Sequence, residues 1–286
     1  LGVETYVQED ERIFPISNSA KDVREKILHN IKSANFIKEK VSEVIPIETG
    51  FKIKTNKSEY FFQDVVISSG GKSYIDGTEH KIIPFVPSLV GLNTQQKAPS
   101  GIILKNVYSC EIKNEGDILF THFGISGPLT YKISSIKAGE KFPYTLTFDL
   151  YKDLPNLQDL LNKNPHKDIK NILSNYLPQN FVKYLLGDLS DIKAHNIDGK
   201  TRDSILEKLH NFKLTIIGTN RGEETVSAGG FDLNEINPKT MESKLHPHLY
   251  FTGEALNIDG FCGGFNLQNA WSTAFVAAEG IISQAE

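Results

Sequence analysis

Two glycine-rich turns lie far apart in the sequence and contain residue types that bind nucleotides. The first is Ser69-Gly70-Gly71, and the second starts with Gly253-Glu254 and ends with Gly263-Gly264. Glycine lacks a side chain, so it permits positive φ angles and lets a ligand approach the backbone closely. A carboxylate such as that of Glu254 can accept hydrogen bonds from sugar hydroxyl groups. The pattern indicates a nucleotide-type ligand, although an ordinary strand–helix unit with a glycine-rich turn explains the same residues.

The second turn is predicted to connect a buried strand to a long helix. Residues 249–251 are apolar and aromatic, which is typical of a buried strand. Asn266 is suited to cap the helix that follows, whose free N–H groups would favour negative charge by ~0.3–1 kcal/mol. We expect one apolar face on this helix: Leu267, Trp271, Ala274, Phe275, Ala278, Ile281 and Ile282. Small residues such as Ala277 and Gly280 would let the helix lie close against a sheet.

The first turn has a similar setting. Residues 65–68 form a β-branched run that stops at Gly70-Gly71, so a buried strand could deliver a tight turn to a ligand. Taken alone, a hairpin that ends on two glycines is the simpler interpretation.

Long stretches of the chain resemble one family in the same order. They are RIFPISNSAKDV (12–23), DVVISSGGKSY (64–74), GDILFTHFGISGPL (116–129), ETVSAGG (224–230), INPKTMESKLHPHLYFTGE (236–254) and TGEALNIDGFCGGFNLQNAWSTAFVAAEG (252–280). The chain is similar to the aminoacetone-oxidase-like (BaiN-type) bacterial FAD-dependent oxidoreductases. The matches cover nearly the whole chain, which makes the resemblance specific.

This resemblance implies a fold, a cofactor and a set of contacts. The fold class is α/β with an α+β insertion, in which a discontinuous Rossmann-like FAD/NAD(P)-binding domain is joined to a β-barrel-like domain with a helical lobe. The implied FAD contacts are Val41, Ser69, Gly70, Gly71, Gly253, Glu254, Gly263, Gly264, Phe265, Asn266 and Leu267. Val41 would contact the adenine through its backbone, and the N–H groups of 265–267 would face the flavin. His122, Gly229 and Gly230 would lie on the substrate side of the flavin, and no residue is assigned as the catalytic base.

The chain differs from the family pattern in two places, and these differences lead to a competing hypothesis. No G-x-G-x-x-G turn occurs in the 286 residues, so the main pyrophosphate-binding segment is expected upstream of Leu1. A glycine-rich stretch that usually follows G-G-K-S-Y is absent after Tyr74. The alternative is therefore a non-catalytic binding module that cannot hold FAD by itself.

The change of pattern along the chain predicts three parts. Residues 1–87 and 229–286 would form the FAD-binding domain, with a helix capped by Ser17 or Ser19 and short strands between 41 and 68. Residues 88–153 and 212–228 would form the barrel-like insertion, in which Pro128 starts a helix to Ile136. Residues 154–211 read as short helices punctuated by proline and glycine, and would form the helical lobe.

Composition narrows the class of protein. Hydrophobic residues at 39% and charged residues at 23% describe a globular protein. A net charge of −4 and the lack of a basic stripe favour a small organic substrate over nucleic acid. No run of about 18 apolar residues and no signal-peptide pattern indicates a membrane or secretion, so a cytoplasmic location is expected.

Other candidate residues support simpler roles. His246 and His248 lack partners at metal-ligand spacing, so we predict surface positions at a strand entry and no metal site. Cys262 is predicted to be a small buried side chain rather than a redox thiol. Arg12 and Arg221 could bind an acidic group, but surface ion pairs are the commoner role.

The leading hypothesis is an FAD-dependent oxidoreductase that moves hydride or electrons between a small organic substrate and the flavin. NAD(P) or oxygen would be the redox partner, and NAD(P) rests on the resemblance alone. The competing hypotheses are the binding module described above and a flavoprotein that acts on RNA.

Overall fold

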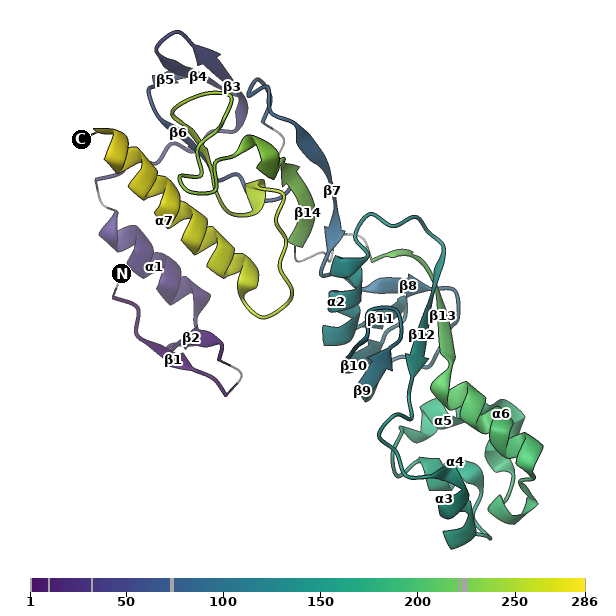
Figure 1. The fold of residues 1–286 in the computed structure, drawn as a ribbon. Coiled ribbons are helices and arrows are strands. Elements are labelled where there is room, and N and C mark those ends of the chain that lie inside the picture. The colour runs from purple at the N-terminus through teal and green to yellow at the C-terminus, as the bar shows by residue number, and fades with distance from the viewer. Residues whose placement is uncertain are drawn as a thin grey trace. The chain divides into compact units, whose positions relative to one another are not determined.

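The chain divides into two compact units (Figure 1). The computed structural model describes residues 2–9, 11–31, 33–72, 75–220, 222 and 226–285. Unit 1 consists of Leu1–Ile82, Phe231–Leu256 and Gly263–Glu286. Unit 2 consists of Ile83–Gly230 and Asn257–Cys262. The predicted division of the second part into a barrel and a separate helical lobe stays a prediction.

Unit 1 contains a short parallel strand pair that matches the two predicted buried strands. Strand β6 (Val65–Ile67) pairs with β15 (Leu249–Phe251), with Val65 opposite Leu249 and Ile67 opposite Phe251. All three residues of β15 are fully buried. In β6 only Ile67 is buried and Val66 is 43% exposed, so the expected burial is confirmed for β15 and only in part for β6. Both strands are apolar runs, which is why the sequence predicts them.

An antiparallel three-stranded sheet lies in the same unit. Its strands are β3 (Val41–Ile47), β4 (Gly50–Thr55) and β5 (Glu59–Phe62), paired in chain order. The turn at Thr49-Gly50 requires glycine, because Gly50 has a φ of 125° and a Cβ there would lie 2.4 Å from the Phe62 carbonyl oxygen. The three predicted strands are confirmed to within a residue or two.

The N-terminal part of unit 1 is a hairpin and a helix. Strand β1 (Thr5–Val7) pairs with β2 (Ile13–Pro15), and α1 (Ala20–Asn30) follows. Of the two predicted caps, Ser19 is the one used, because its side chain accepts a hydrogen bond from the Asp22 N–H.

The long helix α7 (Phe265–Ala285) corrects one prediction and confirms another. Asn266 does not cap it, because the Gln268 N–H already donates to the Gly264 carbonyl oxygen and Asn266 lies inside the first turn. The face that packs carries small residues, Thr273, Ala277 and Gly280. The large apolar residues Leu267, Trp271 and Phe275 are 69%, 49% and 66% exposed. The packed face carries small residues because α7 lies very close to its neighbours: a Cβ on Gly280 would lie 3.1 Å from the Thr240 carbonyl oxygen.

Unit 2 is built around a closed six-stranded barrel with the strand order β10-β11-β8-β13-β12-β9. The strands are β8 (Leu92–Thr94), β9 (Ile102–Ser109), β10 (Asn114–Phe120), β11 (Gly124–Ser126), β12 (Tyr144–Asp149) and β13 (Phe212–Thr219). Helix α2 (Pro128–Ile136) follows β11 with proline in its first turn, as predicted. The barrel expected from the sequence is therefore present.

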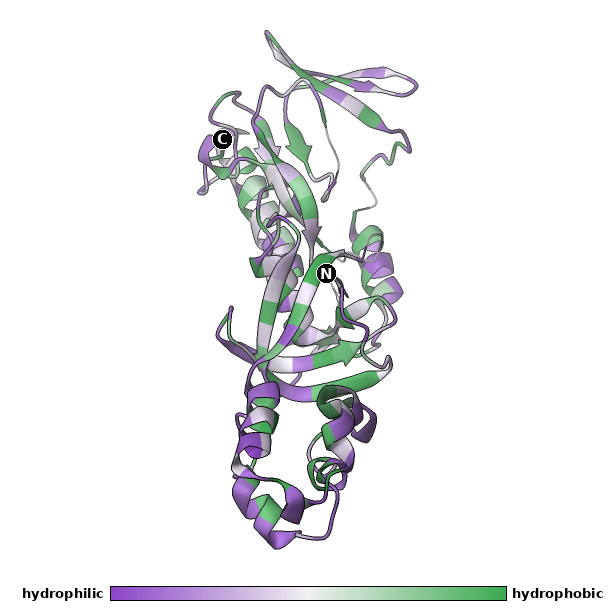
Figure 2. Ribbon diagram, turned by 90° about the vertical axis from the view of Figure 1, so that its right-hand side faces the viewer, coloured by the Kyte–Doolittle hydropathy of each residue, from purple (hydrophilic) through white to green (hydrophobic). Residues whose placement is uncertain are grey.

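Four short helices are inserted between β12 and β13. They are α3 (Leu157–Lys163), α4 (Ile169–Leu173), α5 (Gln179–Leu186) and α6 (Gly199–His210). Each mixes hydrophilic and hydrophobic residues (Figure 2). Their buried residues form one continuous cluster with the barrel interior, in which Phe181 of α5 lies 5.3 Å from Phe120 and 5.5 Å from Phe212 between ring centroids.

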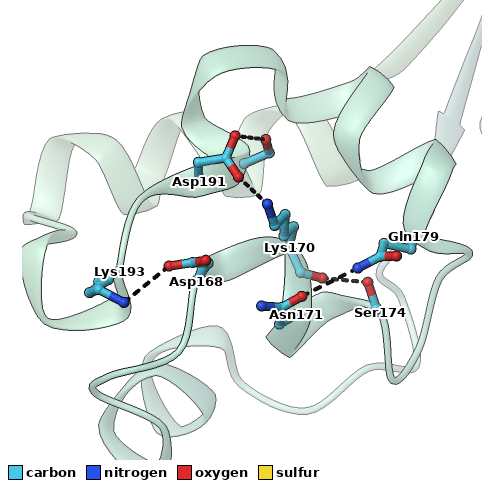
Figure 3. Close-up of polar contacts among 8 residues, drawn as sticks. Asp168, Lys170, Asn171, Ser174, Gln179, Asp191 and Lys193 are labelled. Carbon is cyan, nitrogen blue, oxygen red and sulfur yellow. Dashed lines mark hydrogen bonds and ion pairs between the residues drawn. The ribbon is translucent and has the colours of Figure 1, made fainter.

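The surface of these helices carries ordinary polar contacts (Figure 3). Lys170 pairs with Asp191, and Lys193 Nζ lies 3.5 Å from Asp168 Oδ1. The Lys170 ammonium lowers the pKa of the Asp191 carboxyl by donating a hydrogen bond to it. Both pairs join segments of one lobe and stabilise its surface weakly.

Several strands differ from the sequence-based prediction. Strand β9 is continuous from Ile102 to Ser109, although Asn106 within it has a φ of 52°. Strand β7 (Ile82–Ser88) was not predicted, and it pairs with β14 (Val226–Phe231). Gly229 and Gly230 therefore lie inside a strand, whereas a glycine pair predicts a turn. Thr225 and Tyr74, which also entered the predictions, lie outside the described residues.

The described residues also contain four 3-10 turns: Gly187–Asp191, Ala194–Asn196, Leu233–Glu235 and Gly253–Ala255. No helix in the described ranges is long and apolar enough to cross a membrane.

Candidate cofactor site

The two predicted glycine turns begin at the same edge of the parallel strand pair. Ser68 and Thr252 follow β6 and β15, and their hydroxyl oxygens lie 2.7 Å apart. The Thr252 N–H donates to the Ile67 carbonyl oxygen at 3.0 Å, which continues the pairing by one residue. Because carboxyl ends of parallel strands meet at one edge, ligands bind there in α/β proteins.

A cavity of about 910 Å³ opens beside the end of β6. Its described lining residues are Lys40, Val41, Val44, Ile53, Phe62, Asp64, Val65, Val66, Ile67, Ser68, Ser69, Lys72 and Ile75. Val41 and Ser69, both of which the resemblance assigns to FAD, thus line the same space. The Ser69 hydroxyl oxygen is buried and has no hydrogen-bond partner among the described residues. Apolar walls with a few polar groups are typical of small-molecule sites.

The turn after β15 is fixed by side chains of α7. Gly253 adopts a φ of 64° and begins the 3-10 turn Gly253–Ala255, which carries the half-buried Glu254. The Gly253 N–H donates to Thr273 Oγ1 at 2.9 Å, and Asn269 Nδ2 donates to the Gly253 carbonyl oxygen at 3.4 Å. The position of Glu254 therefore depends on α7.

The backbone directly before α7 borders open space, where a ligand could approach it. Gly263 and Gly264 have φ angles of 139° and 89°, which side-chain-bearing residues rarely adopt. A Cβ on Gly264 would meet no atom within 4 Å, so space lies in front of it. The first N–H groups of a helix have no partner within the helix and can bind an anion or a carbonyl oxygen.

The predicted contacts fall into two groups within unit 1. Val41 and Ser69 line the cavity, while the described lining residues include none from 253–267. The two groups are connected through the Ser68–Thr252 hydroxyl pair and the Gly253–Thr273 hydrogen bond. That all of them contact one FAD molecule stays a prediction.

The predicted substrate-side residues lie in unit 2. His122 is exposed at the tip of the β10–β11 hairpin, where the Thr121 N–H donates to the Gly124 carbonyl oxygen. Gly229 has a φ of 106°, and a Cβ there would lie 2.5 Å from the Pro84 carbonyl oxygen. The pairing of β14 with β7 therefore accounts for Gly229 without a ligand, and the substrate-side role stays a prediction.

Comparison with known proteins gives the family. The family model described as "HI0933-like protein Rossmann domain" matches residues 1–280. The chain belongs to the HI0933-like family. This confirms the resemblance at the level of the family and the Rossmann-like class of the fold.

Three curated relatives of this HI0933-like chain carry two different names. The chain is 29% identical to the ribosomal RNA dihydrouridine synthase of Escherichia coli, over 93% of this chain and 73% of that protein. It is 30% identical to the ribosomal RNA dihydrouridine synthase of Haemophilus influenzae, over 87% of this chain and 68% of that protein. It is 26% identical to the 3-dehydro-bile acid delta(4,6)-reductase of Clostridium scindens, over 93% of this chain and 74% of that protein.

Two cationic residues of this HI0933-like chain were not predicted as site residues. Lys40 and Lys72 line the cavity and directly adjoin the predicted contacts Val41 and Gly71. Lysine side chains suit phosphate groups. Their positions next to predicted contacts could have indicated these lysines as site residues. Surface lysines are too common, however, for the sequence alone to select these two.

The remaining candidates have structural explanations or are corrected. His246 Nε2 lies 3.3 Å from Glu79 Oε2, and His248 Nδ1 lies 2.9 Å from Asp64 Oδ1. No group of three or more potential metal ligands occurs within the described part of the chain. Cys262 is exposed, so the prediction of a buried side chain was wrong, because it lies in a surface loop before the glycine pair. Arg221 lies outside the described residues.

Proposed function

We propose that this protein is a flavin-dependent reductase that binds FAD at the carboxyl end of the β6–β15 pair. The observation that carries the proposal is the cavity beside β6, which Val41 and Ser69 line together. In the sequence, the antiparallel sheet β3–β5 extends from Val41 almost to Ser69, and the resemblance implies that both residues contact FAD. Membership of the HI0933-like family supports the same cofactor.

The residues present fit FAD by three observations. The buried Ser69 hydroxyl lacks a partner among the described residues, and a ligand hydroxyl or phosphate oxygen could provide one. The cavity volume of about 910 Å³ lies within the range of cofactor sites, which is roughly 300–1,000 Å³. The positive φ angles at Gly263 and Gly264 place two side-chain-free residues directly before the first N–H groups of α7, which can bind a ligand.

Each group of residues would then have a defined task. Val41 would contact the adenine through its backbone, and Lys40 and Lys72 would supply positive charge for the phosphates. The Glu254 carboxylate would accept hydrogen bonds from the hydroxyl groups of the flavin side chain or ribose. N–H groups of 265–267 would donate to the flavin and favour negative charge there. Bound FAD supplies hydride transfer, which amino-acid side chains cannot provide.

The names of the relatives support a common reaction class. A dihydrouridine synthase and a delta(4,6)-reductase are both named for adding hydrogen across a carbon–carbon double bond in a ring. We therefore propose that this protein transfers a hydride from reduced FAD to one carbon of such a bond, while the other carbon takes a proton. NADH or NADPH would re-reduce the flavin.

Two substrate classes compete for this reaction. Uridine in ribosomal RNA is the first candidate, because two relatives at 29% and 30% identity carry that name. A small unsaturated ketone is the second, because the net charge of −4 gives no electrostatic attraction to RNA. The expectation of a small organic substrate and no nucleic-acid partner stays a prediction.

Spectroscopy and product analysis test the proposal in sequence. The protein expressed from its complete gene is expected to be yellow, and NADH or NADPH should bleach the flavin band under anaerobic conditions. The reduced protein is then mixed with unmodified ribosomal RNA or with an unsaturated steroid ketone, and products are measured by mass spectrometry. A gain of two hydrogens in uridine identifies the first candidate, and the same gain in the steroid identifies the second. A colourless protein that takes up no added FAD would favour the non-catalytic module.

A further inference from the structure

The backbone of Gly253 is held by α7 through both of its polar groups. Its N–H donates to Thr273 Oγ1 at 2.9 Å, and its carbonyl oxygen accepts from Asn269 Nδ2 at 3.4 Å. Thr273 and Asn269 lie one helical turn apart, so a single face of α7 fixes the orientation of this residue. The peptide groups on either side of Gly253 cannot rotate without breaking these bonds.

The Thr273 hydroxyl is directed by a second hydrogen bond. It donates to the Asn269 carbonyl oxygen at 2.7 Å, one turn earlier in the same helix. Since its hydrogen is used there, its oxygen faces Gly253 as an acceptor. The Thr273 residue is only 7% exposed, so water does not replace either bond. Serine can reproduce this arrangement, whereas valine has the shape of threonine without the hydroxyl.

The orientation of Gly253 determines where Glu254 points. Gly253 has a φ of 64°, in the left-handed region, and this reverses the chain directly after β15. Ala270 Cβ lies 3.5 Å from the position that a Gly253 Cβ would take, so the turn rests on α7. A small rotation at Gly253 would therefore displace the Glu254 carboxylate, and displacements of about 1 Å can strongly weaken a functional contact.

We propose that Thr273 is a positioning residue, which acts on FAD through the orientation of Glu254. The inference rests on the proposed function, because Glu254 is assigned there to the hydroxyl groups of FAD. Thr273 itself lies behind the turn, on the helix side, and makes its hydrogen bonds to backbone atoms. Asn269 supports the same turn through the carbonyl oxygen of Gly253.

A double-mutant cycle on FAD affinity tests this inference. The variants are Thr273→Val, Thr273→Ser and Glu254→Gln, with Ser272→Ala as a matched control on the exposed side of the same helix. Dissociation constants come from the quenching of FAD fluorescence. Thr273→Val is expected to weaken FAD binding about tenfold, which corresponds to about 1.4 kcal/mol, because the Glu254 carboxylate would be displaced from the FAD hydroxyl groups. Thr273→Ser should restore the affinity, and Ser272→Ala should leave it unchanged.

The decisive result is the behaviour in the Glu254→Gln background. If Thr273 acts through Glu254, Thr273→Val should cause a clearly smaller loss of FAD affinity there than in the unaltered protein. An equal loss in both backgrounds would overturn the inference and leave a general structural role. Asn269→Ala provides a second variant, with the same expected dependence on Glu254, if Thr273→Val does not fold.

Failure of the proposed function gives a different result. In that case the unaltered protein takes up no FAD, and the fluorescence of the added cofactor stays constant. If the unaltered protein binds FAD and Thr273→Val binds it equally well, only the positioning role is contradicted.

Discussion

The Ser68 and Thr252 hydroxyl oxygens lie 2.7 Å apart and join the ends of β6 and β15, which are distant in sequence. Thr252 is almost completely buried while Ser68 is exposed, so this hydrogen bond is partly buried. It follows directly on the last backbone hydrogen bond of the pair, from the Thr252 N–H to the Ile67 carbonyl oxygen. The Ser68–Thr252 hydroxyl pair thus fixes the position at which both glycine turns begin.

Removing one member of this hydroxyl pair should destabilise unit 1. Ser68→Ala leaves the Thr252 hydroxyl unsatisfied, which costs about 1–3 kcal/mol. The double variant Ser68→Ala/Thr252→Val should lose less stability than the sum of the single variants, because it leaves no orphaned group. Trp271 is the single tryptophan and lies in unit 1, so its fluorescence during urea unfolding reports this unit selectively. Additive losses would contradict the pairing.

Gly264 should be needed for the cofactor as well as for the turn. Gly264→Ala places a Cβ at a φ of 89°, which costs roughly 1–2 kcal/mol, and projects it into open space in front of α7. Gly101→Ala is the control, because Gly101 has a φ of 79° with equally open surroundings in unit 2. Both variants should lose stability, but only Gly264→Ala should weaken FAD binding, measured by titration. Equal FAD affinity of the two variants would remove Gly264 from the site.

Lys40 and Lys72 should make FAD binding sensitive to salt. Both line the cavity, and charge pairs near the surface are screened within about 10 Å at 0.1 M salt. The double variant Lys40→Gln/Lys72→Gln should bind FAD several-fold more weakly at low salt, in keeping with roughly 0.2–1 kcal/mol for each exposed charge pair. Its affinity should also change less as salt rises. Lys57→Gln, in an exposed turn of the same unit, is the control and should behave like the unaltered protein.

Buried His80 should make unit 1 less stable in mild acid. Its Nδ1 lies 2.6 Å from the Thr78 carbonyl oxygen and therefore donates, so Nε2 accepts from the Ser243 hydroxyl at 2.9 Å. Burial lowers the pKa of His80 below its ordinary value of 6.5, although nearby Glu235 opposes the shift. Below about pH 6.5 the unfolded chain binds more protons than the folded chain. The contribution of His80 to the free energy of unfolding is therefore fully present above about pH 6.5 and decreases as the pH falls toward the lowered pKa.

The pH effect can be assigned by comparison of two histidine variants. The free energy of unfolding from Trp271 fluorescence is measured between neutral and mildly acidic pH. His80→Asn should flatten this dependence, while His29→Asn, on exposed α1, should retain it. The same slope in all three proteins would exclude His80 as its source.

The helices inserted between β12 and β13 should unfold together with the barrel. Phe181 of α5 is fully buried against Phe120 and Phe212 of the barrel strands. Phe181→Ala should destabilise unit 2 by about 3–5 kcal/mol, because it leaves a cavity at the junction. Hydrogen exchange should accelerate in the barrel strands as well as in α3–α6, whereas Tyr176→Ala, at a partly exposed position, should have little effect. Acceleration confined to the helices would indicate a separately folding lobe.

The sequence best predicts the elements that depend on a local pattern of residue types. The apolar runs of β6 and β15 and the turn at Gly50 follow from strand composition and from glycine's freedom at positive φ. The barrel is expected mainly from the resemblance, since short strands such as β8 and β11 have no distinctive period, and the core that it shares with the helices is seen only in the structure. Gly229 shows the limit of glycine patterns, because strand pairing requires it there instead of a turn.

The candidate site shows the same contrast between local patterns and long-range contacts. Val41 and Ser69 were identified by resemblance, and their shared cavity depends on long-range folding that no local pattern encodes. Asn266 was misassigned as a cap because the sequence does not reveal that the backbone of Gly264 performs that role. The small residues Ala277 and Gly280 of α7 pack closely as expected, whereas the exposure of the large apolar residues Trp271 and Phe275 could not be predicted from their size.

Hydrogen exchange with and without FAD tests the central claim most directly. The claim is that the turns at 68–71 and 263–268 contact one FAD molecule. Addition of saturating FAD should slow amide exchange in both segments and in the strand that begins at Val41, with one FAD bound per chain. Protection of only one of the two turns, or of neither, would contradict the account.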